Sequence, residues 1–216
     1  EAVGLFHAQL KLVPDEIIPN RKYPQLSALD NEMFEAVLSC SNNGLSSFPE
    51  EFKHMILENM NLLSQSWDKV LANGNEFIAS EQVLAHIDLH PHNMIMNDGK
   101  LVAFIDFDSL MSAPLKMMIG FSAYKLLRQI VSKGNNQLSR QEINNLVESY
   151  LEGIYKYFPE QRCGKNIVAL YASTEVCRRI AYILKLNISD RNTQWNHVLA
   201  IQIRGLKEIE ILFDLL

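Results

Sequence analysis

The sequence predicts a mainly α-helical protein with a small β-hairpin element, which is an α+β fold. Most segments place apolar residues at three- and four-residue steps, the spacing of one face of a helix. The exception is residues 83–108, where short apolar runs are joined by an Asn-Asp-Gly turn sequence that is typical of a β-hairpin. Polar residues gather around these runs, so we expect any chemistry to be carried there.

Helices are expected wherever the apolar spacing continues, and prolines, glycines and polar turns mark their ends. Three prolines indicate a loop over residues 14–29, and Asp30 suits the N-cap of the helix that follows. Pro49 suits the first turn of a long helix, which Asn73 and Gly74 are expected to close. The expected helices span residues 2–13, 30–39, 49–73, 115–132, 142–158, 166–186 and 193–216.

Composition and charge exclude several classes of protein. The chain has 216 residues and a formal net charge of -5, and its lysines and arginines are scattered, so we expect no nucleic-acid partner. Its three cysteines are far apart and form no CxxC pattern, which argues against a disulfide framework or a thiolate zinc site. No signal peptide and no bilayer-spanning apolar run is visible, so we expect a cytoplasmic protein without a membrane partner.

The polar cluster lies at the ends of the expected strands. Short apolar runs over residues 83–85, 94–96 and 101–105 have strand composition, and residues 97–99 form the turn between the last two. Six side chains with acid, amide or imidazole groups flank these strands, and they are His86, Asp88, His90, Asn93, Asp106 and Asp108.

Part of this cluster suits phosphoryl transfer. Such a reaction needs a carboxylate that orients the attacking hydroxyl and oxygen ligands for Mg²⁺ at the phosphates. Asp88 and Asn93 place a carboxylate and an amide oxygen on one short loop, and Asp106 returns a second acid at the end of the following strand. These residues therefore form a candidate magnesium and phosphoryl-transfer set.

The order of these residues resembles that of a known family. The pattern HxDxHxxN at residues 86–93, followed by IDFD at residues 105–108, is similar to the catalytic loop and metal-binding segment of the aminoglycoside phosphotransferase and choline kinase family. The resemblance implies a protein-kinase-like fold, in which residues 1–216 form a single C-terminal large lobe. It also implies an ATP-dependent small-molecule kinase that uses Mg²⁺ and a hydroxyl acceptor of the aminoglycoside, choline or homoserine kind.

The same resemblance implies a role for each residue of the motif. Asp88 corresponds to the catalytic carboxylate, and Asn93 and Asp106 correspond to the Mg²⁺ ligands. Asp108 is a weaker candidate for the metal site. His86 and His90 are expected to support the loop or to contact phosphate. The residues that bind the nucleotide base are not identified by the motif.

The chain also departs from the family pattern. It has no GxGxxG loop and no lysine strand, so the family's N-terminal nucleotide-binding lobe is expected to be missing and this lobe alone to be inactive or nearly so. Ile87 replaces a usual glycine, and no acid opens the helix after IDFD. A non-catalytic kinase-like binding module is therefore the alternative function.

Two further interpretations concern histidines and acids. Histidines and an acid alternate at positions 86, 88, 90 and 92, which would suit a zinc-dependent hydrolase if this segment were a strand, although Pro91 interrupts it. The isolated histidines are interpreted as surface residues, and they are His7, His54 and His197. The acids of the later helices are interpreted mainly as solvated faces, and they are Glu142, Glu148, Glu152 and Glu175.

Overall fold

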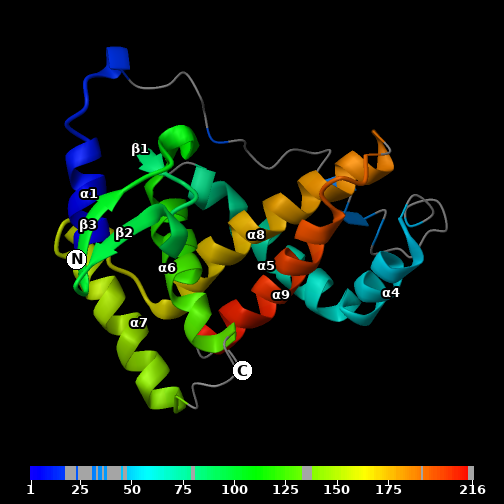
Figure 1. Ribbon diagram of the computed structural model, residues 1–216. Helices are drawn as coiled ribbons and strands as arrows, with labels where there is room; N and C mark the ends of the chain where they lie inside the picture. The colour runs from blue at the N-terminus through cyan, green and yellow to red at the C-terminus, as the bar shows by residue number, and fades with distance from the viewer. Residues whose placement is uncertain are drawn as a thin grey trace. The chain divides into compact units, whose positions relative to one another are not determined.

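The structure confirms the predicted fold class, a mainly helical α+β protein (Figure 1). This computed structural model describes residues 1–17, 23, 31–32, 34–35, 37, 45, 48–78, 81–132, 138–190 and 192–213. Its helices are α1 (Ala2–Leu10), α4 (Glu50–Glu58), α5 (Met60–Ile78), α6 (Leu115–Ser132), α7 (Arg140–Tyr155), α8 (Lys165–Ile188) and α9 (Asn196–Leu212). Its strands are β1 (Gln82–His86), β2 (Met94–Asn97), β3 (Lys100–Phe104) and β4 (Leu110–Pro114).

The chain divides into two compact units, each with its own buried residues. The first unit comprises residues 1–24, 76–172 and 208–216, and it contains all four strands together with α1, α6 and α7. The second unit comprises residues 25–75 and 173–207, and it contains α4, most of α5 and the adjoining parts of α8 and α9. Within the described residues, no helix is both long enough and apolar enough to cross a bilayer.

Two antiparallel strand pairs frame the polar cluster in the first unit. The β2–β3 pair is the predicted hairpin, and its turn residues Asp98 and Gly99 have φ of 49° and 74°, as a type I′ turn requires. The other pair joins β1 to β4, with His86 opposite Leu110. The sequence did not predict β4, because its Pro114 and its short apolar run resemble the start of the next helix.

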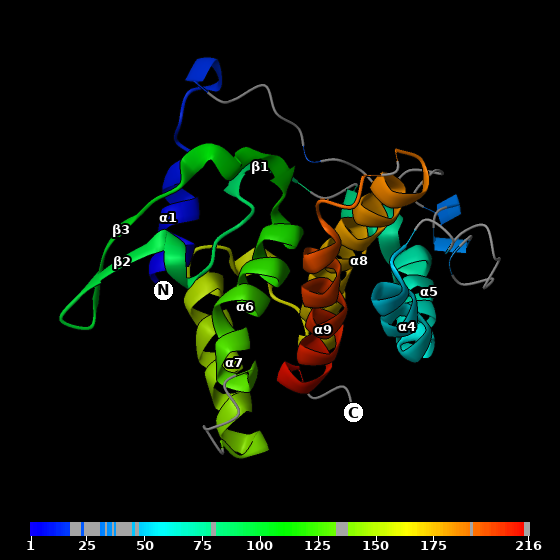
Figure 2. The same cartoon turned by 45° about the vertical axis from the view of Figure 1, so that its right-hand side comes forward.

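Helix α1 lies beside the hairpin in both views of the molecule (Figures 1 and 2). The Phe6 ring of α1 stacks on the Phe104 ring of β3, with 4.3 Å between their centroids. α1 also packs against α7 and β1. These contacts fix α1 next to the strand that leads into the polar cluster.

Helices α6 and α7 lie side by side in the first unit. A capping box begins α7, in which the Ser139 hydroxyl accepts from the Glu142 N–H and the Glu142 carboxylate accepts from the Ser139 N–H. The buried Glu208 carboxylate accepts from the Tyr124 hydroxyl and pairs with Arg128, which ties α6 to the end of α9. This pairing satisfies a carboxylate that would be costly to bury alone.

The second unit is built around a buried aromatic pair. The Phe34 and Trp67 rings stack with 4.0 Å between centroids, and the Trp67 Nε1–H donates to Asn31. The predicted helix over residues 30–39 lies largely outside the described residues, although those described within it are helical. The predicted loop over residues 14–29 is likewise described only in part, with a 3₁₀ turn at Asp15–Ile17.

The predicted long helix over residues 49–73 is wrong at two points. It is broken at Asn59, whose backbone leaves the helical region with φ of −110° and ψ of 15°. It also continues past Asn73 and Gly74 to Ile78, and the Asn73 side chain donates to the Lys69 carbonyl within the helix. The later helices differ from their predicted bounds only by a few residues at their ends.

A glycine in α6 provides a test of the helix packing in the first unit. A Cβ at Gly120 would lie 2.4 Å from the Tyr171 Cβ and 2.7 Å from the Ala172 nitrogen, both on α8. α6 and α8 would therefore have to move apart at this point. We expect Gly120→Ala to lower the free energy of unfolding by about 1 to 3 kcal/mol, as overpacked cores do. Urea unfolding measures this change. An increase of about 1 kcal/mol, the gain that alanine gives in an open helix, would contradict the close packing.

Candidate functional site

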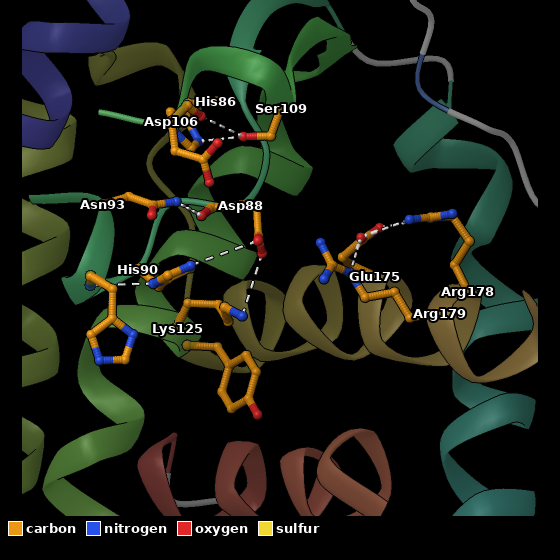
Figure 3. Close-up of polar contacts among 12 residues, drawn as sticks. His86, Asp88, His90, Asn93, Asp106, Ser109, Lys125, Glu175, Arg178 and Arg179 are labelled. Atoms are coloured by element: carbon orange, nitrogen blue, oxygen red, sulfur yellow. Dashed lines mark hydrogen bonds and ion pairs between the residues drawn. The ribbon is translucent and has the colours of Figure 1, made fainter. Parts of the chain in front are cut away.

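The 86–93 loop connects β1 to β2 and carries most of the polar cluster (Figure 3). Strand β1 ends at His86, and a 3₁₀ turn η2 (Pro91–Asn93) precedes β2. Between them, the fully buried Leu89 side chain anchors the loop to the core. Ile87, at the position where the family has glycine, does not have a positive φ, so its backbone conformation does not require glycine.

Asp88 lies at the centre of the loop and is partly open to solvent. Its Oδ1 is 3.4 Å from the Lys125 Nζ of α6, and its Oδ2 is 3.8 Å from the His90 Nε2 (Figure 3). The Asp88 side chain is 32% exposed, whereas that of Lys125 is 18% exposed. A cation from a distant helix therefore holds one oxygen of the predicted catalytic carboxylate.

Asn93 is buried and joins the loop to the segment that follows β3. Its Nδ2 donates to the Asp88 carbonyl at 3.0 Å, and its backbone carbonyl accepts from the Ile105 N–H at 3.0 Å. Because the amide nitrogen serves the loop, the amide oxygen is the atom that suits a cation. The second bond brings Asn93 next to the residue that precedes Asp106.

Asp106 follows β3 and has a left-handed backbone with φ 65° and ψ 55°. This conformation costs a non-glycine residue on the order of 1–3 kcal/mol, and it concentrates at functional sites. The Ser109 hydroxyl lies 3.3 Å from the Asp106 carbonyl. Asp106 and Asp108 both have exposed side chains, so both can reach a ligand in solvent.

His86 connects the end of β1 to the 105–109 segment. Its Nε2 lies 3.2 Å from the Ile105 carbonyl, which can only accept, so Nε2 carries the proton. Its Nδ1 lies 3.1 Å from the Ser109 hydroxyl. The buried ring thus spans the two segments that carry Asp88 and Asp106.

His7 is not the surface residue that the sequence indicated. It is completely buried, its Nδ1–H donates to the Val3 carbonyl, and its Nε2 accepts from the His86 N–H at 3.3 Å. Burial lowers the pKa of His7 to about 4, because a charged ring would be desolvated and would meet another N–H. His54 is exposed and pairs with Glu58, and His197 is exposed beside Trp195.

The remaining histidines of the loop do not form the strand that the zinc interpretation requires. β1 ends at His86, and the His90 Nδ1 accepts from the His92 N–H at the start of η2. Burial and the Lys125 charge lower the pKa of His90, while the Asp88 and Asp106 charges oppose this shift. Among the described residues, no group of three or more His, Cys, Asp or Glu side chains is arranged to hold a metal.

The acids of the later helices are engaged by partners within the protein. Glu142 caps α7, Glu148 pairs with Lys165, and Glu152 pairs with Arg162. Glu175 is buried between two arginines, Arg178 and Arg179, and the interpretation of Glu175 as a solvated residue is therefore wrong (Figure 3).

Sequence reasoning missed two residues of the site, Lys125 and Ser109. Lys125 lies in the most apolar of the long helices, and a charged residue in such a helix is a signal that a buried partner exists. Ser109 carried no comparable signal, because its contact with His86 depends on how the chain folds back after β3.

Comparison with known proteins identifies the family to which this fold and loop belong. A model of the phosphotransferase enzyme family (APH) matches residues 1–116, more than half of the sequence. The chain therefore belongs to the phosphotransferase enzyme family.

Among solved structures, the chain is similar to spectinomycin phosphotransferase, APH(9)-Ia, in complex with ADP and spectinomycin. The TM-score is 0.56 at 20% sequence identity, and the match covers 98% of this chain and 63% of that chain. At this identity the likeness supports the fold, and this chain spans less than two thirds of the other protein. No curated protein sequence matches the chain.

The burial of His7 predicts how stability depends on pH. The folded-state pKa of His7, about 4, lies below the unfolded value of 6.5, so the unfolded chain binds a proton first as the pH falls. This contribution to stability is complete above about pH 7 and is lost as the pH falls from 6.5 towards 4. It amounts to about 3 kcal/mol.

We therefore expect His7→Gln to remove about 2.5 kcal/mol from the stability difference between pH 7.5 and pH 4.5, because most of the shift falls between these two pH values. Urea unfolding at the two pH values measures this difference in wild type and variant. The exposed His54→Gln serves as the matched control and should leave the difference unchanged. An equal pH dependence in wild type and His7→Gln would show that His7 is not held neutral.

Proposed function

We propose that the protein is a cytoplasmic small-molecule kinase that transfers the γ-phosphoryl group of ATP to a hydroxyl group, with Mg²⁺. The observation that carries this proposal is the arrangement of Asp88, Asn93 and Asp106 on two segments joined by the hydrogen bond from Ile105 to Asn93. It provides one partly exposed carboxylate for a hydroxyl and two hard oxygen donors for a cation.

Asp88 is the proposed catalytic carboxylate. An ionised carboxylate orients the acceptor hydroxyl and accepts its proton as the bond to phosphorus forms. Its position on a short loop between two strands, with the Leu89 anchor beside it, limits how far it can move. Such fixed positioning is the main source of rate enhancement available to a phosphotransferase.

Asn93 and Asp106 are the proposed Mg²⁺ ligands. The residues fit this ion, because Mg²⁺ prefers oxygen donors and keeps several waters, so that one carboxylate and one amide oxygen suffice. The ion, when bound, would neutralise the charge of the phosphates. Asp108 is the weaker candidate, and His86 and His90 are proposed to hold the loop rather than to react.

The nucleotide contacts are proposed to come mainly from a small lobe that has no counterpart among the described residues. The similar spectinomycin phosphotransferase was solved with ADP and spectinomycin, which supports a nucleotide and a small acceptor here as well. Several large apolar side chains of the hairpin and the segment after it are exposed and suit such a neighbour, and they are Ile95, Met96, Val102, Ile105 and Phe107.

A non-catalytic kinase-like binding module is the second candidate, and one observation favours it. The first turn of α6, which is fully described, contains no acid, whereas the family pattern has an aspartate at the start of this helix. Without this aspartate, the 105–109 segment has one anchoring contact fewer than the family pattern provides. Turnover by the full-length protein decides between the two functions.

We expect Asp88→Asn to lower the kcat for ADP formation by 10² to 10⁴, the range over which general acid–base catalysis contributes. The full-length natural protein is assayed with Mg²⁺ and ATP, and calorimetry measures ATP binding in the same samples. Binding should persist, because Asp88 is assigned to the acceptor and not to the nucleotide. Nucleotide binding without turnover in the wild type would favour the binding module, and no nucleotide binding at all would refute the kinase.

The two acids of the 105–109 segment allow a matched test of the metal site. We expect Asp106→Asn to raise the half-saturating Mg²⁺ concentration for turnover at least about tenfold, whereas Asp108→Asn raises it less than about threefold, since loss of a direct ligand costs more than loss of a nearby charge. Titration of activity with Mg²⁺ at constant ATP measures both. A larger increase in this concentration for Asp108→Asn than for Asp106→Asn would mean that Asp108, and not Asp106, is the direct Mg²⁺ ligand.

A further inference from the structure

Lys125 reaches the site from α6, outside the two motif segments described above. Its Nζ lies 3.4 Å from the Asp88 Oδ1 and 5.5 Å from the centre of the Phe121 ring, one helical turn earlier on α6. Resting on the proposed function, we propose that Lys125 is a positioning residue that holds Oδ1 and thereby presents Oδ2 to the acceptor hydroxyl.

The burial of Lys125 argues for a role beyond stability. Its side chain is 18% exposed and lies over a buried phenylalanine, so its charge is partly desolvated. A desolvated ion pair contributes little net stability compared with apolar residues of similar volume. Apolar side chains dominate the adjoining positions of α6, yet a lysine reaches out of this surface to Asp88. We therefore expect the ion pair to fix the orientation of the Asp88 carboxylate rather than to stabilise the fold.

The two oxygens of Asp88 have different surroundings. Lys125 is within ion-pair distance of Oδ1, whereas the His90 Nε2 is 3.8 Å from Oδ2, beyond the length of a hydrogen bond. Each carboxylate oxygen can accept more than one hydrogen bond, so Oδ2 can take a hydroxyl whatever else it contacts. Lys125 thus restricts the rotation of the carboxylate about its last bond.

In the proposed step, the acceptor oxygen forms a bond to the γ-phosphorus of ATP while its proton passes to the Asp88 Oδ2. The bond between the γ-phosphorus and the oxygen that bridges to the β-phosphate breaks, and its electron pair leaves with ADP. Solvent later takes the proton from Asp88. A carboxylate that is rotated away from the hydroxyl would slow this step without altering how ATP binds.

The test compares Lys125→Met with Lys125→Arg in the full-length natural protein. ADP formation from Mg²⁺ and ATP is measured with choline, homoserine, kanamycin and glucose as acceptors, and with water alone. We expect Lys125→Met to lower kcat about 100-fold, the cost of a displacement of about 1 Å, with the KM for ATP within about twofold. Lys125→Arg should recover part of the loss, because it keeps the charge.

Lys116→Met is the matched control on the same helix, since Lys116 also lies over an aromatic ring but is remote from the motif in its contacts. It should change kcat less than about twofold. If Lys125→Met fails to fold, as thermal unfolding would show, the comparison is made between Lys125→Arg and Lys125→Gln. A Lys125→Met kcat within about threefold of wild type, or an equal loss in Lys116→Met, would overturn the proposal.

The double variant Asp88→Asn/Lys125→Met tests whether Lys125 acts through Asp88 or affects kcat independently of it. If Lys125 acts through Asp88, the double variant should be no slower than Asp88→Asn alone, because coupled residues are not additive. A further 100-fold loss would overturn the proposal. Turnover that Asp88→Asn abolishes but Lys125→Met does not would refute only the role of Lys125. No ADP formation by the wild type would refute the proposed function and this role together.

Discussion

The candidate site depends on the hydrogen bonds of one buried residue, His86. Its backbone N–H donates to His7 on α1, and its ring bridges to the Ile105 carbonyl and the Ser109 hydroxyl beyond β3. Three segments that are distant in the sequence therefore meet at this residue. Because burial makes each unsatisfied polar group costly, these bonds leave the 86–93 loop and the 105–109 segment little freedom relative to each other.

Burial favours the neutral form of two histidines of the site, His7 and His90. Burial and the Lys125 charge lower the pKa of His90, so its ring is neutral near pH 7 and adds no second cation beside Asp88. His7 is kept neutral by burial, which preserves its Nε2 as the acceptor for the His86 N–H. The fixed ion pair of Lys125 and Asp88 then places the carboxylate in a partly desolvated setting, where positioned charges act more strongly than in water.

The sequence was sufficient for the fold class, the hairpin and the motif, because these depend on local patterns such as the Asp98-Gly99 turn. It failed where the backbone leaves the helical region, as at Asn59, and where pairing is long-range, as in β4. His7 was misread because its burial follows from packing against a strand that lies 79 residues later. Lys125 was missed for the same reason, since its partner is on another element.

The most direct test of the account is a crystal structure of the full-length natural protein with Mg²⁺ and a non-hydrolysable ATP analogue. The account predicts that Mg²⁺ is bound by the Asn93 amide oxygen and the Asp106 carboxylate, with Lys125 still paired to the Asp88 Oδ1 and with Oδ2 facing the γ-phosphate. A metal held elsewhere, or an analogue bound away from the 86–93 loop and the 105–109 segment, would contradict it.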